Sequence, residues 1–237
     1  MLVSEEKAIS ASKIAYVDMI TPLEKKGKID NDASMTKRVN RITDQLIVQA
    51  KIMRPATSKW EWSVKVIDDP ETVNAWCMAG GKMAIYSGLI TQLDATDDEI
   101  AQVMGHEISH ALANHTAERM SVAMATSIGV LAVAIGSKEN TGAKVAGAAV
   151  AAKLAIELPN SRTSETEADR IGIELAAKAG YDPAAAVTLW EKMAKVGGKT
   201  PVFLSTHPAP ENRQQTLKAL IPEMMPYYQA AKNKSKS

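Results

Sequence analysis

The stretch TDDEIAQVMGHEISHALANHTAERM, from Thr96 to Met120, decides the fold prediction because it combines a helix start with a group of histidines. Thr96 and Glu99 have the spacing of a capping box, in which each side chain bonds the backbone N–H of the other residue. Apolar residues then recur every three or four positions, as on the buried face of an amphipathic helix. The stretch therefore predicts a helix of about five turns with one face against a core.

Three of the chain's four histidines lie in this predicted helix, and two of them have metal-ligand spacing. His106 and His110 are four residues apart, so they share one helical face and can bind a single metal ion. Glu107 lies about 100° further round the helix, within reach of a water on that ion. This H-E-x-x-H arrangement is typical of zinc peptidases, and a chain with so few histidines offers little room for a chance match.

His115 is interpreted as a structural residue. It lies nine residues after His106, about 900° round a regular helix and therefore on the opposite side. Metzincin peptidases avoid this geometry with a glycine break and a histidine ten residues after the first. This sequence has Ala113 and Thr116 at those two positions.

A catalytic zinc ion has three protein ligands and one open position, so a further ligand must come from elsewhere. In SRTSETEADRIG, residues 161–172, Glu165 and Asp169 share one face of a predicted helix. Glu165 is the candidate ligand, and Asp169 can accept a hydrogen bond from the outer nitrogen of a ligand histidine. Glu167 points away by about 200° and is the weaker candidate. Taken alone, these acidic residues would be interpreted as a first helical turn that complements the helix dipole, and only H-E-x-x-H favours a ligand.

Composition and coarse patterning indicate one domain over residues 1–237. The chain is 46% hydrophobic, and its net charge of +1 argues against a nucleic-acid-binding protein that works by bulk electrostatics. Helical spacing recurs along most of the chain, whereas WEWSVKVI (60–67) and KMAIYS (82–87) have the pattern of strands. We therefore expect an α+β fold, mainly helical, with a small sheet.

Three further segments carry expectations of their own. Residues 121–158 contain two Ala-, Val- and Gly-rich runs, each too short to cross a bilayer, and predict a helical hairpin or lid, with membrane contact as the alternative. Residues 230–237 predict a flexible tail. The N-terminal MLVSEEKAIS lacks the pattern of a signal peptide, so we expect either a cytosolic protein or a trimmed leader.

Four motifs together resemble the gluzincin metallopeptidases that include HtpX, the CAAX prenyl endopeptidases and periplasmic proteases of the BepA and LoiP type. They are NAWCMAGGKMAIYSGLI (74–90), GHEISHALANH (105–115), SRTSETEADRIG (161–172) and STHPAPENR (205–213). The resemblance implies a zincin-like domain with one Zn²⁺ per chain that hydrolyses peptide bonds. It implies His106, His110 and Glu165 as metal ligands, Glu107 as catalytic base and Asp169 as a partner of a ligand.

The resemblance also draws attention to His207 and Arg213 in the last motif. In periplasmic members a histidine at the place of His207 can block the open metal position, which predicts a regulatory fourth ligand or a transition-state donor. A residue that merely starts a helix is the alternative. Arg213 could steady a carboxylate or the developing oxyanion, and an exposed arginine is the alternative.

The segment from Gly81 to Tyr86 matches the edge strand that precedes the metal-binding helix in this family. An edge strand can hold an extended substrate by main-chain pairing, so the expected substrate-binding residues are Gly81, Lys82, Met83, Ala84, Ile85 and Tyr86. An inner strand with Met83 and Ile85 in the core is the alternative. Backbone recognition predicts broad sequence tolerance, as in the cleavage of unfolded or misfolded proteins during protein quality control.

HtpX and the prenyl endopeptidases have membrane spans that this sequence does not show, so the resemblance is to the soluble periplasmic branch. It implies a bacterial periplasmic protein, as a lipoprotein with a trimmed leader, with polypeptide substrates and peripheral or outer-membrane association. Two rival functions are a zinc-bound chaperone or assembly factor with latent or dispensable protease activity, and a structural zinc domain. Glu107 argues against both, because a purely structural site has no use for a base beside its metal.

Overall fold

The computed structural model describes residues 2–131, 159–196, 201–208 and 212–234. Helices predominate in these ranges and surround one three-stranded sheet, which confirms the predicted α+β class. The elements in chain order are α1 (Glu5–Lys25), α2 (Ala33–Met53), η1 (Pro55–Lys59), β1 (Ser63–Ile67), β2 (Ala75–Met78), β3 (Lys82–Tyr86), α3 (Ser87–Gln92), α4 (Asp97–Leu112), α5 (His115–Leu131), α7 (Arg162–Lys178), α8 (Ala185–Lys195), α9 (Val202–Thr206) and α10 (Arg213–Lys234).

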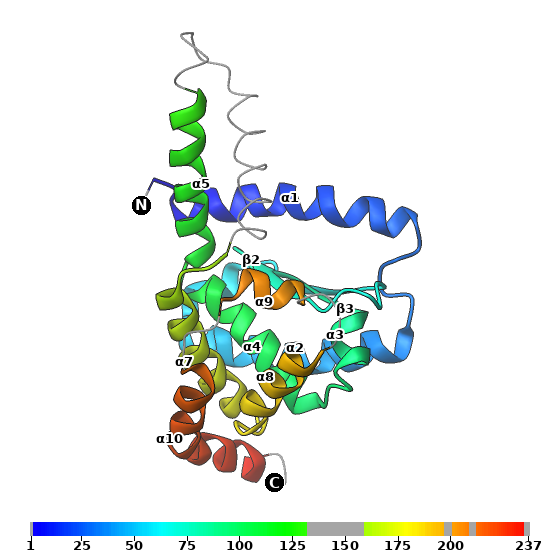
Figure 1. Ribbon diagram of the computed structural model, residues 1–237, viewed down its shortest axis with the longest axis vertical. Helices are drawn as coiled ribbons and strands as arrows, with labels where there is room; N and C mark the ends of the chain where they lie inside the picture. Colours follow the sequence, from blue (N-terminus) through cyan, green and yellow to red (C-terminus); the bar gives the residue numbers. More distant parts are fainter. Residues whose placement is uncertain (1, 132–158, 197–200, 209–211, 235–237) are drawn as a thin grey trace.

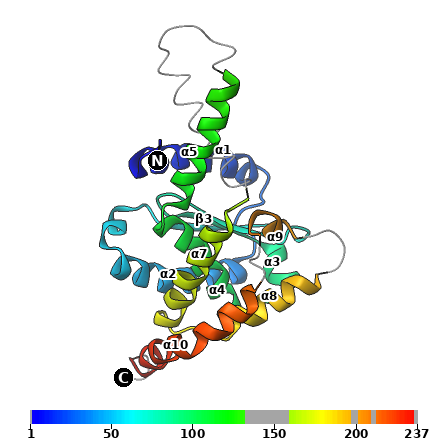
Figure 2. The same ribbon diagram turned by 60° about the vertical axis from the view of Figure 1, so that its left-hand side comes forward.

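Helices cover both faces of the sheet (Figure 1). Alternate residues of a strand point to opposite faces, and in β2 Trp76 and Met78 pack towards α1 and the start of α5. Ala75 and Cys77 on the other face belong to the larger core that includes α2 and α4. Helices α7 and α8 pack on α4, and α10 packs on α7 and α8 (Figure 2). Helix α4 is therefore buried between the sheet and a second layer of helices.

The strand that precedes α4 is an inner strand, so the prediction that residues 81–86 form an edge strand for substrate is wrong. β3 pairs in parallel with β1 on one side and antiparallel with β2 on the other. Gly80 and Gly81, with φ of 86° and 80°, form the tight turn that folds β2 back onto β3. The sequence predicted strands only over residues 60–67 and 82–87 and missed β2, which together with β1 forms the outer strands of the described sheet.

Helix α4 begins as predicted but ends earlier. Thr96 Oγ1 accepts a hydrogen bond from the Glu99 amide at 3.2 Å, and the Glu99 carboxylate accepts one from the Thr96 amide at 2.9 Å. The helix stops at Leu112, because Asn114 adopts a left-handed φ of 61°. The predicted helix of about five turns therefore corresponds to α4, and His115, which was expected to continue it, starts the next helix.

The predicted lid and tail lie only partly in the described ranges. Residues 121–131 belong to α5, which rises past α1 in both views, while residues 132–158 lie outside the described residues. Residues 230–234 of the predicted tail are the last residues of α10. Only residues 235–237 of that segment lie outside the description.

No helix in the described ranges combines the length and the apolar character that a membrane span requires.

Two glycines allow α4 and α7 to cross at close range. A Cβ atom placed on Gly172 would lie 2.9 Å from both the backbone N and Cα of His106, and one on Gly105 would lie 3.0 Å from the Gly172 carbonyl oxygen. Real Cβ atoms essentially never approach backbone atoms as closely as 2.9 Å, so Gly172 has no room for a larger residue, and at Gly105 an added Cβ would force the backbone of α7 to shift. This crossing brings the first turns of α7 to the histidines of α4.

We predict that Gly172→Ala destabilises the protein, because the added methyl group must push α7 away from the backbone of α4. The expected loss is about 1–3 kcal/mol in the free energy of unfolding, measured by denaturant titration. Thr163→Ala, on the exposed surface of the same helix, is the control and should change stability by less than about 0.5 kcal/mol. Alanine has a higher intrinsic helix propensity than glycine, by roughly 1 kcal/mol. If the Gly172→Ala variant were more stable than the wild type by this amount, the close crossing would be contradicted.

Candidate metal centre

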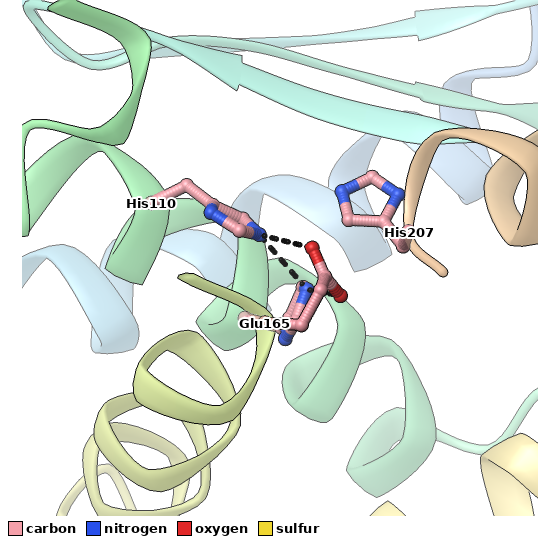
Figure 3. A group of neighbouring side chains, drawn as sticks. His110, Glu165 and His207 are labelled. Carbon is pink, nitrogen blue, oxygen red and sulfur yellow. Dashed lines mark hydrogen bonds and ion pairs between the residues drawn. The ribbon is translucent and has the colours of Figure 1, made fainter. Parts of the chain in front are cut away.

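Three side chains from two helices meet at one point in the interior. His106 and His110 extend from α4, and their Nε2 atoms are 3.1 Å apart. Glu165, in the first turn of α7, places Oε2 3.4 Å from His106 Nε2 and Oε1 3.3 Å from His110 Nε2. Figure 3 shows His110, Glu165 and His207 pointing towards one another. The structure thus brings together the three residues predicted as ligands.

The arrangement fits a tetrahedral zinc ion. Ligand atoms about 2.0–2.2 Å from such an ion lie about 3.3 Å from one another, which agrees with the 3.1–3.4 Å separations of the three groups. Among the described residues, His106, His110 and Arg213 lie within ion-pair distance of the fully buried Glu165, but none of them forms a hydrogen bond of good geometry with its carboxylate oxygens. Buried carboxylates need compensation, and a cation between these side chains would supply it.

The outer nitrogen of His106 has a carboxylate partner. His106 Nδ1 lies 3.0 Å from Asp169 Oδ1, one helical turn beyond Glu165, as predicted. Arg213, the first residue of α10, donates to Asp169 at 2.6 Å and lies 3.1 Å from Glu165 Oε2. Its guanidinium also stacks on Trp190, 3.5 Å from the ring centroid. Arg213 is therefore buried behind His106 and steadies carboxylates, which excludes the exposed alternative.

These charges shift the pKa values of the cluster in opposite directions. Burial disfavours a charged His106, but Glu165 and Asp169 together outweigh it and raise the pKa of His106 to about 9. Burial also opposes ionisation of Glu165, yet the two histidines hold its pKa below the ordinary value. The pKa of His110 lies well below its ordinary value, because burial and the neighbouring histidines disfavour a further positive charge. Without metal, His106 therefore holds a proton that a cation must displace.

Glu107 and His207 face each other beside the ligand group. Both side chains are buried, and His207 Nε2 lies 3.2 Å from Glu107 Oε1. His207 offers a nitrogen within 4.8 Å of the ligand atoms of His106, His110 and Glu165. Its Nδ1 lies 3.0 Å from the Phe203 carbonyl oxygen, which can only accept, so Nδ1 donates there and Nε2 is the nitrogen that faces Glu107 and the ligand group. The C-terminal end of α9 thus positions His207 beside the ligand group.

The predicted position of His115 is wrong. Because the helix breaks at Asn114, His115 does not lie on the opposite side of α4 but turns back, with its Nδ1 2.9 Å from His110 Nδ1. Asparagine tolerates the left-handed conformation that ends many helices, and this signal in the sequence was overlooked. Asn160 was also missed, and its Nδ2 lies 3.5 Å from His110 Nε2. No pattern in the sequence marks it.

β2 is a strand of the sheet that packs directly on α4, the helix that carries His106 and His110. Burial raises the pKa of the Cys77 thiol, and the negative charge of Glu107 raises it further, which places this β2 residue near the predicted base. Cys77 is buried, as expected for a small packing residue.

Two histidines and a glutamate from crossing helices, with a second glutamate between the histidines in sequence, define a metallopeptidase type of site on an α+β domain. Residues 33–221 match Peptidase family M48, and the chain belongs to this family. Its members use zinc, for which the donor set His106, His110 and Glu165 is suitable.

Several relatives carry names that describe proteases. Mitochondrial metalloendopeptidase OMA1 from Arabidopsis thaliana is 38% identical over 68% of this chain and 33% of its own length. OMA1 from Schizosaccharomyces pombe is 35% identical over 79% of this chain and 53% of its own length. The beta-barrel assembly-enhancing protease of Escherichia coli is 28% identical over 83% of this chain and 41% of its own length. The chain thus spans between a third and about half of these relatives.

We predict that zinc binding releases about one proton per metal ion at pH 7, because the cation displaces the proton of His106. Calorimetric titration of metal-free protein in buffers of different ionisation enthalpy measures this number. Because the pKa of His106 is raised from 6.5 to about 9, this histidine stays protonated until the pH approaches 9. The apparent zinc affinity should therefore rise as the pH increases from about 6.5 to about 9. A binding enthalpy that does not depend on the buffer at pH 7 would contradict the prediction.

Proposed function

We propose that the chain is a zinc-dependent endopeptidase in which His106, His110 and Glu165 hold the metal. The observation that carries this proposal is the place of Glu107, a buried carboxylate on the ligand helix that faces the cluster at His207. A purely structural zinc site closes its coordination with four side chains and has no use for such a carboxylate. Membership of a peptidase family supports the same conclusion and implies polypeptide substrates.

The chemistry divides between the metal and the base. Zinc held by two imidazoles and a carboxylate supplies a Lewis acid that acidifies water and polarises a carbonyl group. Glu107 accepts the proton of the attacking water on a carboxylate oxygen and later donates it to the leaving amine. Asp169 orients His106, and Arg213 holds Glu165 and Asp169 in place. Arg213 therefore acts on the ligands and not on the oxyanion.

We propose unfolded or misfolded polypeptides as substrates, held in an extended form against β2. β2 is one of the two outer strands of the described sheet, and it packs on α4, the helix that carries His106 and His110. Pairing of main chains recognises any sequence that can extend, which suits quality control. This role replaces the one that the sequence assigned to β3.

A bacterial periplasmic location, as a lipoprotein at the outer membrane, is part of the same proposal. The E. coli relative named for beta-barrel assembly supports it. The mitochondrial OMA1 relatives show that the family also occurs in another compartment.

A zinc-bound chaperone or assembly factor with latent protease activity is the second candidate. It is favoured by the conformation of His207, whose Nδ1 donates to the Phe203 carbonyl and whose Nε2 faces the ligand group. Asn160 donates its backbone N–H to the Thr206 carbonyl at 2.9 Å, and Phe203 donates to Val73 at 3.2 Å, so α9 is anchored at both ends. In this arrangement His207 would supply a fourth ligand to a bound zinc ion and would leave no open position for water.

We predict that Glu107→Gln lowers cleavage of unfolded casein by about 10²–10⁴-fold, because glutamine cannot accept the proton. Zinc content, measured by mass spectrometry of the metal, should stay at that of the wild type. Glu118→Gln, an exposed residue of α5, is the matched control and should cleave normally. Equal cleavage rates of the Glu107→Gln variant and the wild type would contradict the proposed mechanism.

We predict that His207→Ala increases casein cleavage severalfold while zinc is retained, because the variant opens the fourth position to water. Ser205→Ala, at an exposed position of α9, is the control for changes in the helix itself. A decrease of cleavage in the His207 variant would instead identify this histidine as a helper of the reaction.

A further inference from the structure

His110 faces a second imidazole on the side away from the ligand group. Its Nε2 points at His106 and Glu165, as a metal ligand should. Its Nδ1 lies 2.9 Å from Nδ1 of His115, which is itself buried. Nε2 of His115 then lies 3.2 Å from Oε2 of the exposed Glu167. The three side chains form a line from the site to the surface.

Only one placement of protons satisfies this line while His110 binds a metal. Nε2 of His110 must be free of hydrogen to act as a ligand, so a neutral His110 carries its proton on Nδ1. His115 Nδ1 must accept that proton in a hydrogen bond, which leaves the proton of His115 on Nε2. This N–H in turn donates to the Glu167 carboxylate. Every donor in the line therefore meets an acceptor.

Contacts of the Arg54 side chain fix the turn that precedes His115. Arg54 donates to the Leu112 carbonyl oxygen at 2.6 Å and to Asn114 Oδ1 at 3.3 Å, so it satisfies the end of α4 at the turn. Arg54 also forms an ion pair with Glu5 in α1. The corner between α4 and α5 is thus tied to two other helices, and His115 is the first residue beyond it.

The geometry points to His115 as a positioning residue that fixes the tautomer and ring orientation of the zinc ligand His110, with Glu167 orienting His115. Asp169 serves His106 in the same way, through a carboxylate in place of an imidazole. Loss of such a partner typically weakens metal binding by about 10–100-fold. The inference rests on the metal site of the proposed function but not on peptide hydrolysis.

Two substitutions at position 115 separate positioning from packing. The side-chain oxygen of asparagine occupies the place of histidine Nδ1, whereas the amide of glutamine occupies the place of Nε2. We expect His115→Gln to raise the dissociation constant of zinc by about 10–100-fold, because it keeps the contact to Glu167 but offers His110 no acceptor. His115→Asn restores the acceptor and should keep the zinc affinity close to that of the wild type. Competition with a chromophoric chelator measures each constant.

The melting temperature of each metal-free variant controls for damage to the fold. If His115 had only a structural role, both variants would have a lower melting temperature and an unchanged zinc dissociation constant. That result would overturn the proposal. Zinc affinity of the glutamine variant equal to the wild type also overturns it. If the variants at position 115 do not fold, Glu167→Ala carries the test, with an expected weakening of about two- to fivefold and an unchanged affinity as the contradicting result.

The outcome is independent of the proposed enzymatic activity. Absence of casein cleavage by the wild type would overturn the proposed function, whereas the zinc affinities of the variants would still decide the role of His115. Glu118→Ala, on the exposed side of the same turn of α5, is the matched control and should bind zinc like the wild type.

Discussion

The close crossing of α4 and α7 is the contact on which the metal centre depends. Gly105 and Gly172 leave the two backbones almost in touch, with no space for a Cβ on Gly172. Glu165 lies two turns before this point on α7, and His106 follows directly after it on α4. The third ligand is therefore placed by a steric constraint between two helices, and the attraction of opposite charges acts only once the helices have met.

The same crossing encloses several charged groups, and their mutual compensation keeps them buried. Ion pairs without water cost free energy unless further contacts satisfy them. Arg213 bridges Glu165 and Asp169 and stacks on Trp190. Nδ1 of His106 faces the Asp169 carboxylate, whereas Nδ1 of His110 faces the His115 imidazole. The cluster is arranged to hold Glu165 ionised at a place where a cation can replace the proton of a histidine.

Local spacing in the sequence was sufficient to predict the start of α4 and the pairing of His106 with His110, because both depend only on helical geometry. Glu165 and Asp169 followed from the same spacing once H-E-x-x-H required a third ligand, and the resemblance to a family implied the same two roles. His115 was misplaced because a helical wheel assumes a regular helix, which Asn114 interrupts. The sheet order was missed for a similar reason, since the turn at Gly80 and Gly81 adds β2 outside β3. Asn160 reaches the site through tertiary contacts that no local pattern encodes.

The zinc content of Glu165→Ala tests the central claim most directly, because Glu165 is the ligand that the helix crossing delivers. Purified protein is saturated with zinc, freed of excess metal by gel filtration and measured by mass spectrometry of the metal. Glu174→Ala, further along α7 and paired with Lys178, is the control. The account predicts one zinc per chain in the wild type and the control, and almost none in the Glu165 variant. One zinc per chain retained in the Glu165 variant would contradict it.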